Sequence, residues 1–128
     1  MNRHITFGLG ILAGIAIGAT AIDRLHAQAK APGAYAIVDI SAITDPEGMK
    51  ALGPKAGPAA TAAGGHFIAR TENIVALTGT PPKRFVIIGF DNIEKAKAWY
   101  ATPAQKEVND IAAKSTTQRM FVVEGMTN

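Results

Sequence analysis

The sequence predicts an α+β domain in which one antiparallel sheet carries its helices on a single face. The chain has 128 residues, fewer than the roughly 150 of one ordinary domain, so it can build a single core. Hydrophobic residues make up 48% of the chain and charged residues 18%, which is typical of a globular protein and excludes a disordered tail. Segments with strand patterns are separated by segments with helix start signals.

The first 29 residues are typical of a secretory signal peptide. Arg3 supplies a positive start, residues 5–21 carry no charge, and Ala27-Gln28-Ala29 matches the small-residue pattern that precedes cleavage. Cleavage would leave residues 30–128 as a periplasmic or secreted domain. The alternative is an uncleaved inner-membrane anchor, although the uncharged run would reach only about 25 Å as a helix, short of a hydrocarbon core of roughly 30 Å.

The composition excludes several kinds of site. Cysteine is absent, which excludes disulfides, thiol nucleophiles and cysteine-based zinc sites. His66 is the only histidine outside the export segment, so one chain cannot build a multi-histidine metal site. Lysine and arginine are scattered among acids without the clustered stripe that nucleic-acid binding needs. We therefore expect no cofactor, no metal ion and no nucleic-acid partner.

The first strand and the first helix of the domain follow the export segment. Residues 34–43 alternate with period two, which predicts a strand with two different faces. Asp45-Pro46-Glu47 then combines a capping residue, a proline suited to the first helical position and an acid at the positive helix end. Glycines and prolines interrupt the segment that follows, so we expect a kink or two short helical pieces.

Two glycines, Gly64-Gly65, end this helix and precede a short strand at residues 66–70. Because they follow a helix and precede a strand, the reverse of a nucleotide-binding loop, they predict a helix stop and no phosphate site. Residues 74–77 are interpreted as a continuation of the strand or as its hairpin partner. Residues 85–88 form a continuous apolar run, typical of a central strand covered on both faces.

Two further helices and a last strand complete the chain. Asp91 followed by Glu94 fits a capping box and predicts a helix. Thr102-Pro103 repeats the start signal and predicts a third, short helix. Residues 119–124 form the last strand. The helix residues expected to be buried are Ile93, Ala96, Tyr100 and the neighbouring Trp99, then Val108, Ile111 and Ala112.

This order of elements suggests a ferredoxin-like βαββαβ unit with both helical segments on one side of an antiparallel sheet. The other sheet face would then be open. A domain of about 99 residues cannot easily expose an apolar face of that size. The simplest cover is the same face of a second copy, so we expect a homodimer.

From Tyr35 to Gly125 the chain resembles domain-of-unknown-function family 1330. The matching pieces are Tyr35-Ala36-Ile37, Asp45-Pro46-Glu47, Gly64-Gly65-His66-Phe67 with Arg70, Phe90 with Glu94 and Ala96, Ala98-Trp99-Tyr100, Thr102-Pro103 and Val123-Glu124-Gly125. The resemblance implies a dimeric α/β-barrel fold in a superfamily whose members include cofactor-free oxygenases, isomerases and haem-handling enzymes. It implies no activity. His66 stands where the family more often has arginine, so any polar site that the family shares is altered here.

Five residues are candidates for a cleft. Histidine is the side chain whose reference pKa lies nearest to neutral pH, and simple alternation would place His66 on one face with Arg70, where the two could bind a carbonyl or anionic substrate. A half-exposed histidine at a strand start is the structural alternative. Asp39 and Glu124, near Tyr35, could act as paired carboxylates, or they could be solvated or salt-bridged acids.

These residues leave three classes of function open. The first is an exported homodimer that binds a small molecule in a cleft without catalysis. The second is a cofactor-free enzyme that uses His66 as a base or proton shuttle and Arg70 as the anion partner. The third is a structural or stress-associated envelope protein that has no ligand.

Overall fold

Four strands form one antiparallel sheet in the order β2-β3-β1-β4. The computed structural model describes residues 31–126, so the predicted export signal lies outside the described residues. The strands are β1 (Ala34–Ile43), β2 (His66–Thr71), β3 (Arg84–Phe90) and β4 (Thr116–Glu124), and the helices are α2 (Pro46–Ala62), α3 (Ile93–Tyr100) and α4 (Pro103–Ser115). Within the described residues, no helix is long and apolar enough to span a membrane.

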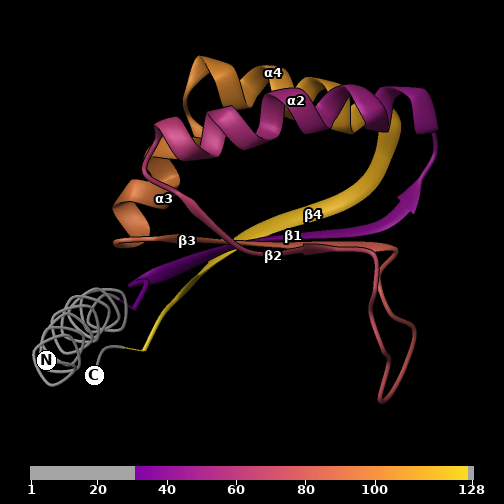
Figure 1. Ribbon diagram of the computed structural model, residues 1–128, viewed down its shortest axis with the longest axis horizontal. Helices are drawn as coiled ribbons and strands as arrows, with labels where there is room; N and C mark the ends of the chain where they lie inside the picture. The colour runs from indigo at the N-terminus through magenta and orange to yellow at the C-terminus, as the bar shows by residue number, and fades with distance from the viewer. Residues whose placement is uncertain (1–30, 127–128) are drawn as a thin grey trace, which may run out of the picture. The chain divides into compact units, whose positions relative to one another are not determined.

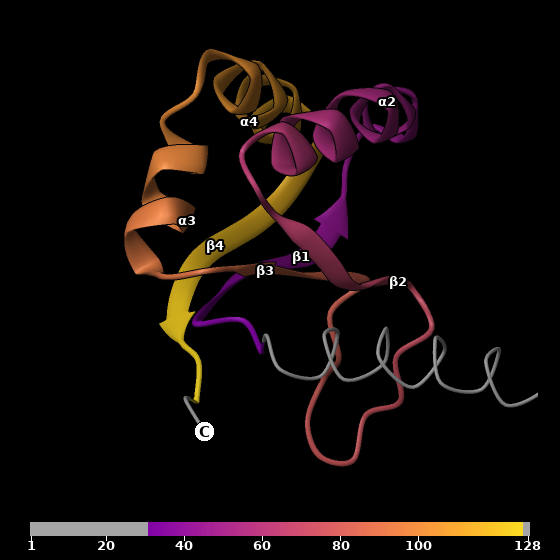
Figure 2. The ribbon, with the colours of Figure 1, turned by 60° about the vertical axis from the view of Figure 1, so that its left-hand side comes forward.

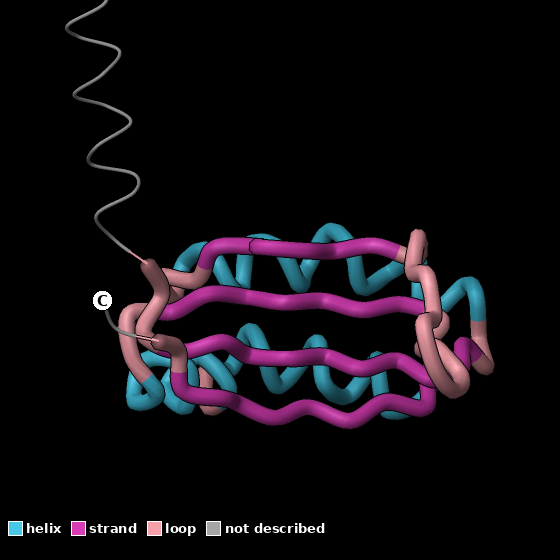
Figure 3. The backbone as a smooth tube through the Cα atoms, turned by 90° about the horizontal axis from the view of Figure 1, so that it is seen from below, coloured by secondary structure: helices cyan, strands magenta, loops and turns pink. Residues whose placement is uncertain are grey.

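The helices lie on one face of the sheet. Figure 1 shows α2 and α4 above the strands, and Figure 3, which looks at the sheet from the opposite side, shows the helices only behind it. Strand β1 pairs antiparallel with both β3 and β4, and β2 pairs antiparallel with β3. This arrangement confirms the predicted ferredoxin-like α+β fold.

Helix α2 is continuous from Pro46 to Ala62, so the expected break into two short pieces is wrong. Pro54 and Pro58 both lie inside the helix and both are exposed. Each proline removes one backbone hydrogen bond, but on the exposed side water can bind the carbonyl group that loses its partner. The other side of the helix buries Leu52, Ala59 and Ala60 and holds the helix together across the prolines.

Residues 72–83 form a loop, and the strand expected at residues 74–77 is absent from it. The backbone N–H of Asn73 bonds the Thr71 hydroxyl at 2.9 Å where β2 ends, and the chain re-enters the sheet when Lys83 N–H bonds the Ile40 carbonyl at 2.8 Å. Between these points the apolar residues have no neighbouring strand with which to pair. Leu77 is 92% exposed.

Helix α3 begins one residue later than the sequence pattern predicts. Asn92, not Asp91, is the N-cap, and its side chain accepts a hydrogen bond from the Lys95 backbone at 2.8 Å. Trp99 fills the space beneath the helix, with its ring centroid 5.4 Å from that of Phe90. Tyr100, which was expected to be buried, is 51% exposed.

Helix α4 begins as predicted. Thr102 is its N-cap, and the Thr102 hydroxyl accepts a hydrogen bond from the Gln105 backbone N–H at 3.2 Å.

The core fills the layer between the sheet and the helices. Its largest cluster joins every second residue of β1 and β3 with side chains from α2 and α3. The members are Ala36, Val38, Ile40, Ala60, Val86, Ile88, Phe90, Ala96 and Trp99. The strand residues between these members point to the face that no helix covers. Phe85 and Ile87 in β3 are therefore only half-buried, and the expected cover on both faces of this strand is incomplete within one chain.

Two glycines of α2 should respond in opposite ways to alanine. A Cβ on Gly57 would meet only the Arg70 guanidinium, at 3.7 Å, so Gly57→Ala should raise the free energy of unfolding by about 0.5–1 kcal/mol through helix propensity. A Cβ on Gly48 would lie 2.0 Å from the buried Ser115 hydroxyl, so Gly48→Ala should lower the free energy of unfolding by about 1–3 kcal/mol. Urea denaturation measures both; the same sign for the two changes would contradict this packing.

Candidate functional site

A cavity of about 270 Å³ lies between the sheet and helices α2 and α4. Figure 2 shows these two helices side by side over the strands that form its floor. The floor is apolar and is made by the helix-facing residues Val38, Ile40, Phe67, Val86, Ile88 and Met120. The walls come from the helices, and polar side chains stand around the apolar centre: Lys50, Arg70, Glu72, Arg84, Gln105, Asn109 and Gln118.

The cavity exists because α2 presents small residues to the sheet. Gly53 and Ala56 line it, and Ala59 and Ala60 are buried further along the same helix. A protein interior is close-packed when neighbouring side chains interdigitate. Gly53 and Ala56 fill less of the space beneath α2 than Met49 and Leu52, which also line it, so part of that space stays open.

A β-bulge in β2 decides which side chains face this cavity. Phe67 is paired with Ile88 and Ala69 with the next residue of β3, Ile87, so Ile68 is an extra residue in β2. The extra residue reverses the alternation after Phe67. Arg70, paired with Val86, therefore lies on the helix side and lines the cavity.

His66 lies on the other face of the sheet. It pairs with Gly89, and a Cβ added to Gly89 would meet Pro32 and Ile68 on the face without helices. The prediction that His66 and Arg70 share a face is therefore wrong, because simple alternation takes no account of a bulge. The histidine is exposed and does not line the cavity.

Arg70 is exposed at the edge of the cavity, and its guanidinium lies against Phe67 and near the backbone of α2. Its central carbon lies 5.0 Å from the centroid of the Phe67 ring, in cation–π geometry. A Cβ built on Gly53 or Gly57 would lie 3.8 or 3.7 Å from its terminal nitrogens, so the bare helix backbone leaves room for the group. Within residues 31–126, no carboxylate lies within 4.0 Å of Arg70 or of Arg84.

Two buried polar atoms of cavity-lining residues have no hydrogen-bond partner in the described chain. They are the indole nitrogen Nε1 of Trp99 and the amide oxygen Oε1 of Gln105. Each residue lines the cavity and is only 2% exposed. The amide nitrogen of Gln105 donates to Asn109 Oδ1 at 2.9 Å, which fixes the side chain from the other end. An unpaired buried donor or acceptor costs about 1–3 kcal/mol, so both atoms would gain from a partner.

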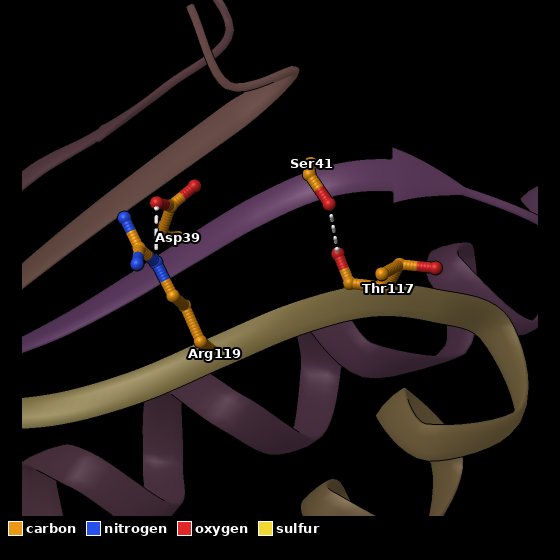
Figure 4. Close-up of polar contacts among 4 residues, drawn as sticks. All are labelled: Asp39, Ser41, Thr117 and Arg119. Carbon is orange, nitrogen blue, oxygen red and sulfur yellow. Dashed lines mark hydrogen bonds and ion pairs between the residues drawn. The ribbon is translucent and has the colours of Figure 1, made fainter.

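The remaining predicted cleft residues lie away from this cavity. Asp39 is on the open face, where it accepts a hydrogen bond from Arg119 Nε at 3.0 Å; Figure 4 shows this pair beside the bond from the Ser41 hydroxyl to the Thr117 carbonyl. Tyr35 and Glu124 lie near one end of β1. Tyr35 is four residues from Asp39 along β1, roughly 13 Å, and Glu124 is five residues along β4 from Arg119, which pairs with Asp39, roughly 17 Å. Of the five candidates, only Arg70 lines the cavity.

Apart from Arg70, the polar residues of the cavity were not predicted from the sequence; they include Arg84, Trp99 and Gln105. Arg84 has a signal in the sequence, because it precedes Val86 and Ile88 by two and four residues and so shares their face of β3. Trp99 was expected in the core and is there, but its cavity-lining position depends on α2.

Among residues 31–126, no group of three or more acidic or histidine side chains could hold a metal ion.

Comparison with known proteins identifies the fold and the family model. A model described as a domain of unknown function, DUF1330, matches residues 33–126. The sequence has no match among curated proteins.

Several solved structures share the fold at low sequence identity. The RPA0582 protein of unknown function from Rhodopseudomonas palustris is 14% identical with a TM-score of 0.57, and the alignment covers 82% of this chain and 94% of that one. SnoaB, a cofactor-independent oxygenase from Streptomyces nogalater, is 9% identical with a TM-score of 0.55, covering 77% and 97%. A dimeric ferredoxin-like protein of unknown function from Thermobifida fusca is 14% identical with a TM-score of 0.53, covering 74% and 92%.

Proposed function

The chain belongs to the DUF1330 family, and from that premise and the geometry of its interior we propose that it binds a small molecule between its helices and its sheet. The observation that carries this proposal is the cavity itself. Ligand sites in proteins are concave, mostly apolar and provided with a few polar groups. An apolar cavity of about 150 Å³ binds benzene, so the 270 Å³ found here suits a ligand with at least one ring.

The lining favours binding over covalent catalysis. The lining has no histidine, cysteine, serine, threonine or tyrosine, and its nucleophilic or proton-transfer side chains are limited to Lys50 and Glu72. The enzyme hypothesis with His66 and Arg70 loses its geometric basis, since the two residues lie on opposite faces of the sheet. SnoaB shows that a cofactor-independent oxygenase can use this fold, but a fold does not carry an activity with it.

Filling the cavity should abolish binding. Gly53 lines the cavity and Gly57, one turn later on the same side of α2, does not, although a Cβ on either would contact only Arg70. Gly53→Leu should therefore weaken the binding of phenol, a neutral one-ring probe, by about tenfold or more, while Gly57→Leu changes it less than threefold. Titration of phenol into the ¹⁵N-labelled protein measures both affinities and shows which backbone amides respond.

The same titration separates the three functional classes. His66→Ala should leave the affinity for phenol within twofold, because this side chain is outside the cavity. Saturable shifts at Val86, Ile88 and Val108 would support the cavity as the site. If a set of neutral, acidic and basic one-ring compounds produced no shifts there, the ligand-binding proposal would be wrong and a structural role would be favoured.

We also propose that two copies pair through the sheet face that the helices leave open. The residues that share this face are largely apolar: Tyr35, Ile37, Ile68, Phe85, Ile87, Phe121 and Val123. The face is visible in Figure 3, and it carries the Asp39–Arg119 pair at one end. A large apolar patch of this kind in a small domain marks an interaction surface, and a two-fold dimer covers it with an identical patch.

The loop at residues 72–83 supports the same pairing. Figure 1 shows it extending from the sheet on the side away from the helices, where a second copy would lie. Its exposed Val75 and Leu77 would gain apolar contacts there. The Thermobifida fusca protein, which has this fold, is described as dimeric.

A charge on the open face should prevent pairing. Phe121 is 43% exposed on that face, and Tyr100 is 51% exposed on α3, so the two aromatic residues offer a matched comparison. We expect light scattering to give a dimer mass for the native protein and for Tyr100→Lys, and a monomer mass for Phe121→Lys, with unchanged circular dichroism. A native protein that stays monomeric at all concentrations would refute the proposed dimer.

We further propose that the protein is exported, on the basis of the sequence of residues 1–29. Mass spectrometry of the protein expressed with its own N-terminus should find a chain that begins at or near Lys30 in the periplasm or the medium. An intact Met1 form in the membrane fraction would favour the anchor instead.

A further inference from the structure

We propose that the ligand of the cavity is a small amphipathic acid, whose carboxylate pairs with Arg70 and whose opposite end carries a hydroxyl group for Gln105 and Trp99. This inference rests on the proposed small-molecule function and adds the chemical class of the ligand. It is carried by the charge of the lining, by the surroundings of Arg70 and by the two unpartnered polar atoms.

The charge of the lining favours an anion. Its ionisable residues are Lys50, Arg70, Arg84 and Glu72, which are three cations and one acid. Lys50 has a partner in Glu47 at 3.4 Å, whereas neither arginine has a carboxylate of the described chain within 4.0 Å. A ligand anion near the two arginines would supply the missing opposite charge.

Arg70 is the better of the two arginines for this role. The Phe67 ring supports one side of its guanidinium, and the bare backbone at Gly53 and Gly57 leaves space beside its terminal nitrogens. A guanidinium held in this way presents a planar set of donors, which matches the two oxygens of a carboxylate. Between Arg70 and the helix walls the floor is apolar, so the body of the ligand is a ring or a short hydrocarbon.

The second polar end of the ligand is indicated by Trp99 and Gln105. The indole N–H can only donate and the amide oxygen can only accept a hydrogen bond. A hydroxyl group does both, so a ligand hydroxyl has the chemistry that each atom lacks. Neither atom is exposed, so the ligand reaches them only after the Gln105 side chain turns away from Asn109. Arg70 comes from the edge strand β2 and Gln105 from α4, so the two recognition groups stand on different walls.

Three one-ring probes separate the two ends of the site. Benzoate carries the acid, phenol carries the hydroxyl, and 4-hydroxybenzoate carries both. The native protein should bind 4-hydroxybenzoate tighter than either single-function probe, each by about threefold or more. Isothermal titration at low ionic strength, with the NMR titration to locate each probe, gives the three dissociation constants.

Two substitutions assign each end to its residue. Arg70→Met keeps the aliphatic stem and should weaken benzoate and 4-hydroxybenzoate by about tenfold, or ~1.4 kcal/mol, while phenol changes less than twofold. Gln105→Met keeps the length of the side chain and should weaken phenol and 4-hydroxybenzoate by about threefold, while benzoate changes less than twofold. Arg119→Met removes a cation from the open face instead and should leave all three probes unchanged.

The outcomes distinguish this inference from the function on which it rests. If phenol binds in the cavity but benzoate binds no tighter than toluene, the acid assignment is wrong and the binding function stands. If Arg70→Met weakens phenol and benzoate equally, Arg70 only supports the cavity wall and the inference is also wrong. If no probe shifts the cavity residues, the inference and the proposed function fail together.

Discussion

A β-sheet has two faces, and this chain supplies helices for only one of them. That constraint determines where each kind of interaction can occur. On the covered face, the small residues of α2 leave an interior space that the core does not fill. On the uncovered face, residues in the opposite phase of the same strands form an apolar surface. The proposed ligand site and the proposed pairing surface therefore use alternate residues of the same strands, so a substitution in one need not alter the other.

A single extra residue in β2 connects the two faces. Without the bulge between Phe67 and Ala69, Arg70 would share the uncovered face with His66, and the cavity would lose one of the cationic side chains in its lining. Bulges re-aim side chains in this way at many functional sites. The exposed histidine and the cavity arginine look like one catalytic pair in the sequence, and the bulge separates them.

The sequence predicts features that depend on local chemistry. The period of β1, the proline start of α2 and the Thr102 cap of α4 each follow from a few neighbouring residues, and all are present. Features that depend on distant parts of the chain were missed. The continuity of α2 follows from packing of its buried side against the rest of the domain. The bulge depends on the pairing register of β2 with β3, and the cavity depends on the distance between the sheet and the helices. Neither the register nor that distance can be read from one segment of the sequence.

The two ends of the described domain are joined to each other. Gly33 accepts a backbone hydrogen bond from Gly125 at 2.8 Å, and an added side chain at either glycine would clash with neighbouring backbone, so the chain enters and leaves the sheet at one corner. A short peptide linking these ends would close the backbone into a ring without bending any strand. New termini could then be opened within residues 72–83, at the opposite end of β3. Such a rearranged chain would keep every strand and helix in place while cutting the one long loop.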